Sequence, residues 1–509
     1  MKPPRPFPVT ALFSVVLISA GCMVGPHYKQ PSAAAPPAFK EQPPVNFKEA
    51  EAAGWKQSQP GDAYSKGRWW ELYNDAALNA LEEQVSVSNQ NVLRAEAQYR
   101  EAKAAVSVAR AALLPVAATA PAATFSGGSG SGTASGGGSG ASGSRKSFNL
   151  PFNVSWEPDL WGNIRRGVTA SAATAQSLAA NVGNARLLYQ AELAQDYFGL
   201  HGNDGEAELL TRTEASYKEY LALTRNRVSA GVAADIDVAE AESQLYAVQS
   251  QLMDLGVQRA AFEHAIAILI GKAPAELTIP PITLNASPPP VPLAVPSELL
   301  ERRPDIAGAE RQVAAANEQI GIAIAAFYPT LSLTGSAGLE SSSLAKWFTW
   351  PSRFWSVGPQ LAETLFDGGR RRGVVVEERA AYDATVAAYR ETVLTAMQQV
   401  EDNLAALRIL AGESDKVRQT IQAATRALDI STEQYRAGTG SYLPVIVSQA
   451  TLLGADVTAQ TLLTRRLTAS VLLIEALGGG WNASQLPSKQ EVTAPDRQPK
   501  AAAPGREVR

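Results

Sequence analysis

Polar and apolar residues alternate over about ten residues in each half of the chain. In residues 148–157 (FNLPFNVSWE) one face is apolar, and in residues 331–340 (LSLTGSAGLE) the apolar side chains alternate with serine, threonine and glutamate. A period of two predicts β-strands, and about ten residues is the length of a strand that crosses a membrane. If the apolar face meets lipid, the outward side chains are those of Phe148, Phe152 and Trp156. For either segment alone, a half-exposed strand in a soluble sheet is the alternative.

Two much longer runs, residues 163–230 and 370–437, contain no proline and predict helices. Apolar residues recur at intervals of three and four in the second run, at Val386, Tyr389, Val393, Met397, Val400, Leu404 and Leu407. This is coiled-coil spacing, and alanine or serine at many seam positions indicates close helix packing. At 1.5 Å per residue, about 67 residues form a helix of about 100 Å. A second helix is expected after each long one, across a tight turn.

The same landmarks occur twice, about 207 residues apart, which indicates an internal repeat. Residues 111–115 (AALLP) match 325–329 (AAFYP), residues 159–167 (DLWGNIRRG) match 365–373 (LFDGGRRRG), and residues 227–231 (RVSAG) match 435–438 (YRAG). Each half reads helix, strand, loop, strand, very long helix, tight turn and long helix. We therefore predict a first repeat over residues 63–289 and a second over residues 290–483.

The beginning of the chain is typical of a secreted, lipid-anchored protein. Lys2 and Arg5 precede an apolar stretch of about 12 residues, which is too short to span a bilayer, and small residues then lead to Cys22. We predict a signal peptide over residues 1–21 and lipid attachment at Cys22, the only cysteine. An ordinary signal peptide with a chance cysteine is the alternative. Residues 22–62, rich in proline and alanine, are expected to be extended, and residues 484–509 to be disordered.

Composition narrows the class of protein. A net charge of −4 argues against nucleic-acid binding. The three histidines lack the spacing of metal ligands, and no nucleotide-binding loop is present, so we expect no enzyme, cofactor or metal site. His201 and His264 are expected on a helix surface or seam. Residues 126–144 are almost entirely glycine and serine, which predicts an exposed loop between two strands.

The predicted strands cannot close a barrel within one chain. Two strands in each repeat give four, and an open sheet edge in lipid leaves unpaired backbone N–H and C=O groups, each at a cost of several kcal/mol. Two chains would supply eight strands, and side chains would fill the interior of such a small barrel. Three chains would supply twelve strands around a lumen. Membrane insertion therefore requires an oligomer.

Several motifs resemble the TolC-type outer-membrane efflux family, in its lipoprotein (NodT-like) branch. They are residues 24–28 (VGPHY), 159–162 (DLWG), 365–369 (LFDGG), 435–438 (YRAG) and 476–481 (ALGGGW), and the resemblance covers nearly the whole chain. It implies a mainly α-helical fold with a transmembrane β-barrel portion. The implied assembly is a homotrimer, with a twelve-stranded barrel in the outer membrane and a helical tunnel across the periplasm.

The resemblance also implies a function and partners. The expected function is a passive exit duct for drugs or other small toxic compounds. The expected partners are a periplasmic adaptor protein, an inner-membrane efflux transporter of the RND type and outer-membrane lipid, with no nucleic acid. Type I secretion of polypeptides and a lipid-anchored coiled-coil envelope protein without a pore are the alternatives.

Glycines lie where each second strand turns into a long helix. Gly162 in the first repeat, and Gly368 with Gly369 in the second, occupy a chain reversal that favours residues without a Cβ atom. Asp367 and Asn163 are the expected N-caps of the long helices.

The far ends of the long helices are expected to form a closed tip. Gly231 and Gly438 follow these helices and suit left-handed C-caps. An acidic group follows the first turn, at Asp235, Asp237, Glu240 and Glu242. In a trimer these carboxylates would form a ring that favours cations or contacts the adaptor. Alternatively, they only balance the helix dipole.

The resemblance places a gate after the second turn. Lipoprotein channels of the family often carry an aspartate and an arginine at the positions of Val447 and Ala450, so neither charge is present here. Leu443 matches the apolar gate residue of the family. We therefore expect an apolar constriction by Leu443 and Val447 rather than an electrostatic gate.

Overall fold

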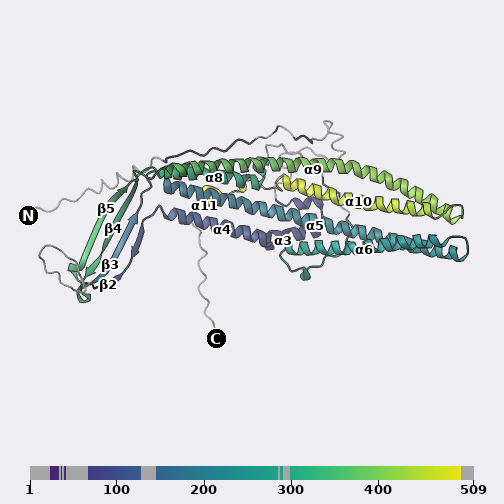
Figure 1. The fold of residues 1–509 in the computed structure, drawn as a ribbon, viewed down its shortest axis with the longest axis horizontal. Coiled ribbons are helices and arrows are strands. Elements are labelled where there is room, and N and C mark those ends of the chain that lie inside the picture. The colour runs from purple at the N-terminus through teal and green to yellow at the C-terminus, as the bar shows by residue number, and fades with distance from the viewer. Residues whose placement is uncertain are drawn as a thin grey trace, which may run out of the picture.

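The computed structural model describes residues 23–33, 36, 39–41, 67–127, 145–284, 287–289 and 299–494. The predicted signal peptide, Cys22 and most of the glycine- and serine-rich loop lie outside these residues. Figure 1 shows a sheet at one end of an elongated molecule and two helical hairpins that run away from it to the opposite end.

The two halves of the chain fold into the same series of elements. The first contains α4 (Gln90–Ala111), strands β1 to β3, α5 (Asn163–Ser229) and α6 (Asp235–Leu269). The second contains α8 (Pro304–Ala325), β4, β5, α9 (Arg370–Arg436) and α10 (Leu443–Ala476). Helices α5 and α9 each have 67 residues, as predicted. The internal repeat is therefore confirmed at the level of structure.

Shorter elements complete the described chain. They are η2 (Trp69–Tyr73), α3 (Ala76–Ser88), η3 (Pro274–Glu276), α7 (Leu299–Arg302), η5 (Leu344–Lys346), η6 (Trp350–Ser352), η7 (Ala483–Gln485) and α11 (Lys489–Thr493). The last two correct the prediction of a disordered tail from residue 484. Ser488 and Glu491 form a capping box, and Val492 is buried against α4 and α5. The cap, the buried Val492 and hydrogen bonds from Lys489 to Thr169 and from Arg110 to the carbonyl of Thr493 fix residues 488–493, although their composition is polar.

The strands form one antiparallel sheet. β3 (Arg145–Trp156) pairs with β4 (Thr330–Ser341), and β4 pairs with β5 (Arg353–Ala362). On its other side β3 pairs with two short strands, β1 (Val116–Thr119) and β2 (Ala122–Ser126), which act as one strand interrupted at residues 120 and 121. Each repeat therefore contributes two strands.

The core is divided along the length of the helices. Near the middle, η2 and α3 pack against α5 and α10 around Trp69, Tyr73 and Phe198. A second cluster joins α8, α9 and α10, and includes Val393 and Val400 of the predicted apolar series. A third lies toward the ends of the hairpins. Many buried residues of α5 are alanines, which lets neighbouring helices approach closely.

Candidate functional site: membrane face, junction and helical tip

The register of the sheet joins the separate apolar alternations into one continuous face. Phe152 lies opposite Ala337, which in turn lies opposite Trp355, and the same alignment places Trp156, Leu333 and Pro359 in one row. The neighbouring rows carry polar groups, such as Asn153, Ser336 and Ser356. Because directly paired residues point to the same side of a sheet, one face is apolar and the other polar. A one-residue slip in any pair would destroy this separation.

Exposure along the apolar face differs from the prediction at one residue. Phe152 is 55% exposed, and Trp156 is partly exposed, with its indole N–H donating to the carbonyl of Leu113 at 3.0 Å. Phe148, however, is only 9% exposed, because the rings of Phe125 and Trp347 cover it. Phe148 thus supports the aromatic residues around it and is not itself available for lipid.

Both edges of the described sheet are open. Among the described strands, β5 pairs on one side only, with β4, and the β1/β2 edge pairs only with β3. Trp355, Val357 and Leu361 of β5 are 79%, 78% and 67% exposed. An edge strand with such a surface can be stable in a membrane only when another strand pairs with it.

Positive φ angles occur where the sheet meets the long helices, as the sequence predicts. Gly162 (φ 83°) and Gly369 (φ 92°) are the N-caps of α5 and α9, and Gly368 also has a positive φ (65°). Asn163 is not a cap, because it is already the first residue of α5. Asp367 lies two residues before the N-cap, yet its carboxylate accepts the backbone N–H groups of Gly369 and Arg371 at 3.0 and 3.1 Å. It thereby satisfies helix N–H groups from outside the helix.

The segment that follows Cys22 is fastened at this junction by a buried arginine. Arg166 of α5 is fully buried and donates to the carbonyls of Val24 and Pro26 at 2.7 and 3.1 Å. It also forms an ion pair with Glu318 of α8 at 2.7 Å. A Cβ atom at Gly25 (φ 101°) would lie 2.7 Å from the Cα of a residue in α8. The sequence shows both motifs, VGP and RRG, but gives no sign that they meet.

At the other end, both hairpin turns have the predicted glycine conformation. Gly231 and Gly438 have φ angles of 69° and 75°. The N–H groups of Val232 and Thr439 each donate to a carbonyl five residues earlier, at 2.9 and 3.0 Å. This is the Schellman arrangement in both turns. The two turns lie at the same end of the molecule, remote from the sheet (Figure 1).

The sequence did not reveal that an arginine and two tyrosines join the hairpins at the tip. Arg227 of α5 donates to the carbonyl of Tyr435 at 2.8 Å, and its guanidinium lies 4.5 Å from the centre of the Tyr435 ring. Tyr435 packs against Tyr442 at 5.1 Å between ring centres, and both are almost fully buried. Burial raises the pKa of the Tyr442 hydroxyl, and the charge of Glu240 adds to this. The tip is therefore held by packing, by the cationic contact of Arg227 and by hydrogen bonds between α5 and α9.

The predicted gate residues share one exposed face of α10. Leu443 and Val447 are 58% and 56% exposed, and Ala450 is exposed one turn further on, while Val445 and Ile446 are buried against the protomer. The acidic group lies at the start of α6. Asp235 and Asp237 occupy its first turn, as expected for charges that balance the helix dipole.

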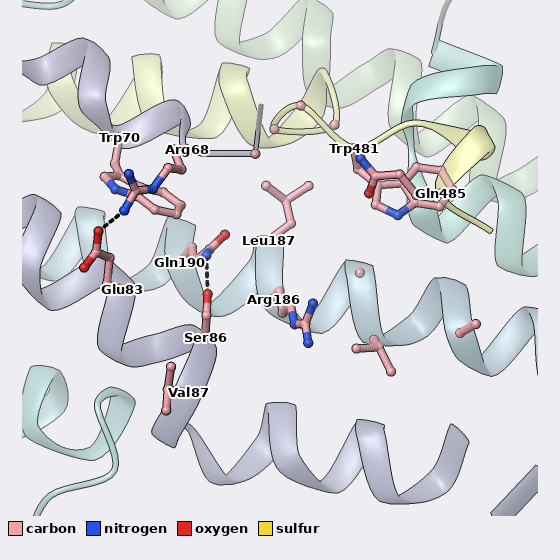
Figure 2. A pocket seen from close by; sticks show the side chains of 17 residues that line it. Arg68, Trp70, Glu83, Ser86, Val87, Arg186, Leu187, Gln190, Trp481 and Gln485 are labelled. Carbon is pink, nitrogen blue, oxygen red and sulfur yellow. Dashed lines mark hydrogen bonds and ion pairs between the residues drawn. The ribbon is translucent and has the colours of Figure 1, made fainter. Parts of the chain in front are cut away.

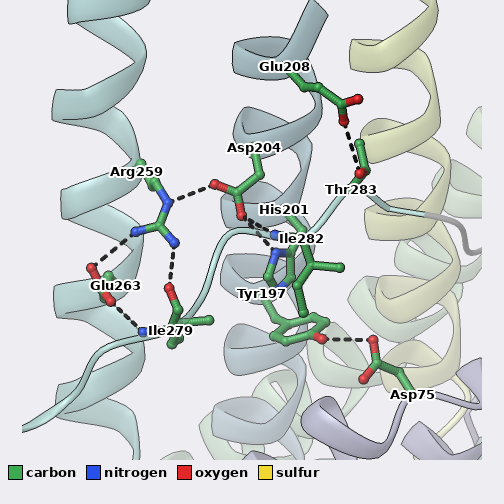
Figure 3. Close-up of polar contacts among 10 residues, drawn as sticks. All are labelled: Asp75, Tyr197, His201, Asp204, Glu208, Arg259, Glu263, Ile279, Ile282 and Thr283. Carbon is green, nitrogen blue, oxygen red and sulfur yellow. Dashed lines mark hydrogen bonds and ion pairs between the residues drawn. The ribbon is translucent and has the colours of Figure 1, made fainter.

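A buried polar network fixes the segment that leaves α6 (Figure 3). His201 of α5, expected at a helix surface or seam, is buried, and its ring Nδ1 lies 2.9 Å from the carboxylate of Asp204. Arg259 of α6 bonds to Asp204 at 2.7 Å and to the carbonyl of Ile279 at 2.6 Å. Burial favours the neutral form of Asp204, but hydrogen bonds from His201 and Arg259 outweigh this effect and lower the pKa of the Asp204 carboxyl group. The network therefore ties the connecting segment to both α5 and α6.

A cavity of about 560 Å³ lies beside the turn after α10 (Figure 2). Its charged side chains already have partners, because Arg68 pairs with Glu83 and Arg186 with Glu96. Gly479, on its wall, has a φ of 55°, and a Cβ atom there would meet the side chain of Leu187 at 2.2 Å. The glycine run 478–480 thus has a structural role in close packing.

Neither a membrane-spanning helix nor a cluster of metal ligands occurs among the described residues. None of the helices in this part of the chain has the length and apolar character needed to cross a membrane. Nor do the described residues contain a group of three or more His, Cys, Asp or Glu side chains placed to hold a metal ion.

Comparison with known proteins shows to which family a chain with this sheet and these paired hairpins belongs. The family model described as outer membrane efflux protein matches residues 81–272 and 295–479, one stretch in each half of the chain. The chain belongs to the outer membrane efflux protein family. Outer membrane protein OprJ of Pseudomonas aeruginosa is 31% identical over 485 residues, covering 94% of this chain and 96% of OprJ.

A second relative and a solved structure support the same family assignment. The toluene efflux pump outer membrane protein TtgC of Pseudomonas putida is 29% identical over 478 residues, which cover 92% of this chain and 95% of that protein. The structure of the outer-membrane channel OprN matches with a TM-score of 0.82 and 28% identity, covering 90% of this chain and 100% of that chain. The predicted fold class, outer-membrane location and efflux-channel function are confirmed.

The junction makes a specific prediction. Arg166→Ala removes the cation that holds Val24 and Pro26 and leaves Glu318 buried without its partner. We expect a loss of stability of about 3–5 kcal/mol, and faster amide hydrogen exchange in residues 23–28, measured by mass spectrometry.

The second repeat supplies the control. Arg372 occupies the corresponding position in α9, where it is exposed. Arg372→Ala should leave exchange in residues 23–28 unchanged. Equal protection of that segment in wild type and Arg166→Ala would show that Arg166 does not fasten it.

Proposed function

We propose that three copies of this efflux channel form one exit duct. The observation that carries the proposal is the sheet register, which gives each protomer one apolar face, one polar face and two open edges. Pairing β5 of one protomer with the β1/β2 edge of the next satisfies both edges. Three protomers then supply twelve strands, with the polar face toward a water-filled lumen and the apolar face toward lipid.

The helices extend the duct away from the membrane. Helices α5 and α9, each about 100 Å long, belong to hairpins that all end on the same side of the sheet. A ring of such hairpins forms a tunnel across the periplasm. A coiled-coil stalk without a pore would leave the two-faced sheet without a role.

The tunnel serves as the passive outlet of a tripartite system. The partners we assign are a periplasmic adaptor protein, which contacts the tip, and an inner-membrane transporter of the RND type, which supplies the energy. The cargo we assign is small toxic compounds, a class to which the toluene named for TtgC belongs. This assignment is favoured over polypeptide secretion because both curated relatives described above span nearly this whole chain, and TtgC is named as part of an efflux pump.

The gate we propose is an apolar constriction at the tip. Leu443 and Val447 face outward from the protomer on the first two turns of α10, and three copies would bring six apolar side chains together around the axis. Such a constriction resists water and ions by dewetting. The adaptor would open it by separating the hairpins, which are linked through Arg227 and Tyr435.

We expect Leu443→Ser and Val447→Ser each to raise single-channel conductance in planar bilayers. The change is about tenfold for each 1.4 kcal/mol of dewetting barrier removed. Val257→Ser is the matched control, because Val257 is an exposed valine of α6 remote from the tip. Two gate variants that stay at the low wild-type conductance would contradict the apolar gate.

Lipid attachment at Cys22 is the second part of the proposal. The support is positional, because Val24 donates its N–H to the carbonyl of Trp161 at 3.1 Å and Met23 lies against Gly162. Met23, the residue next to Cys22 in the sequence, therefore lies beside the junction of sheet and helices. Acyl chains there add about 0.8 kcal/mol per buried CH₂ to membrane attachment.

Intact-mass measurement of the mature protein tests this anchor. We expect a chain that begins at Cys22 and carries the added mass of acyl chains, and Cys22→Ala should lose that mass while retaining the sheet. Cleavage at another residue, or a free thiol at Cys22, would support the ordinary signal peptide instead.

A further inference from the structure

The cationic residues of the sheet are confined to one end of it. Within residues 116–127, 145–156 and 330–362, the cationic residues are Arg145, Lys146, Lys346 and Arg353, and the only acidic residue is Glu340. β3 begins, and β4 passes into β5, at the end of the sheet remote from the helices (Figure 1). All four cationic residues therefore lie at this remote end, and the strand ends nearest the helices carry none.

Two of these charges, Lys146 and Arg353, lie on the apolar face. Lys146 is two residues from Phe148 and pairs with Phe125, so it shares their face. Arg353 pairs with Leu339, which is also on the apolar face. Glu340 points to the opposite, polar face, where it accepts a hydrogen bond from Ser147 at 3.3 Å. The apolar face thus ends in positive charge without a neighbouring carboxylate on the same side.

Exposed aromatic residues accompany the charges in the connection from β4 to β5. Phe348 and Trp350 are 70% and 77% exposed, and the Arg353 guanidinium lies over the Trp350 ring. Lys346 is exposed in the same connection. Aromatic rings with a polar edge and cations with long stems are the side chains that favour the boundary between hydrocarbon and headgroups.

The connection is a built structure rather than a loose loop. The carbonyl of Lys346 accepts hydrogen bonds from the hydroxyl groups of Thr349 and Ser352, both at 2.6 Å. The Trp347 indole donates to the carbonyl of Leu339 at 3.2 Å, and its ring packs on Phe148. The buried Phe148 thus supports the connection, which holds the cations and aromatic residues in place before any ligand arrives.

We infer that this distal rim (Lys146, Lys346, Phe348, Trp350 and Arg353) binds the phosphate groups of outer-leaflet lipid and sets the depth of the barrel. The inference rests on the proposed function, since it takes the apolar face as lipid-facing and the helices as periplasmic. The apolar face continues directly into the rim, and its positive charge complements an anionic headgroup. Free phosphate offers the charge but nothing for the exposed aromatic residues, so lipid is the occupant that uses the whole rim.

The test uses full-length protein purified in detergent, titrated with diphosphorylated lipid A or with phosphatidylcholine, and bound lipid is counted by native mass spectrometry. Lys346→Gln with Arg353→Gln should weaken binding of lipid A about thirtyfold, from the attraction typical of two cations near an anionic surface. The double variant should change binding of phosphatidylcholine much less, because the charge of its phosphate is balanced by its own choline cation. Phe348→Ala combined with Trp350→Ala should weaken the binding of both lipids.

The matched control removes two exposed cations from α9, far from the sheet. Lys416→Gln with Arg418→Gln should bind lipid A as the wild type does. Unchanged lipid A affinity in the rim variant would overturn the inference. Displacement of lipid A by equimolar inorganic phosphate would also overturn it, because the site would then recognise free phosphate. Conductance of the same preparation separates the two proposals. If the rim variant still conducts and binds lipid A as tightly as the wild type, only the inference about the rim is refuted.

Discussion

The open edges of the sheet are the constraint on which the rest of the molecule depends. A protomer supplies β1/β2, β3, β4 and β5 in that order, and the outer side of each edge strand is not paired to any other described strand. In hydrocarbon each such group costs several kcal/mol, so the sheet can enter a membrane only as part of a closed ring. The separation of apolar and polar faces then decides which side of that ring meets lipid. Membrane insertion of this sheet therefore depends on pairing of both its edges with further strands.

The junction between sheet and helices sets the direction in which the helices of the tunnel leave the sheet. The chain must reverse within a few residues, and glycines with positive φ at 162, 368 and 369 permit this. Arg166 then joins three parts of the chain, because it holds the N-terminal segment, α5 and α8 at a single point. Removing a buried charge of this kind leaves its partner uncompensated, which makes the contact costly to lose. The position of the N-terminal segment is thus coupled to the orientation of the hairpins.

Local sequence patterns predicted the elements well and the contacts between them poorly. The bounds of α5 and α9 followed from the absence of proline, with apolar spacing as further support for α9, and β4 appeared within one residue of its predicted ends. The strands β1 and β2 have no clear alternation, since they are short and rich in alanine, so their bounds could not be read from the pattern. The contacts of Arg166 and Arg227 join residues more than a hundred positions apart, and no local periodicity encodes them. Phe148 fitted the alternation, but its burial depends on Trp347, which lies in a distant connection.

Single-particle imaging of the purified protein in a lipid environment tests most directly whether neighbouring protomers close the sheet. We expect a three-fold particle with a closed twelve-stranded barrel in the membrane and a tapering stem of about 100 Å, the length expected from helices of 67 residues. A monomer, or a thin rod without a wider membrane-embedded end, would contradict the claim that the open edges of the sheet are closed by neighbouring protomers.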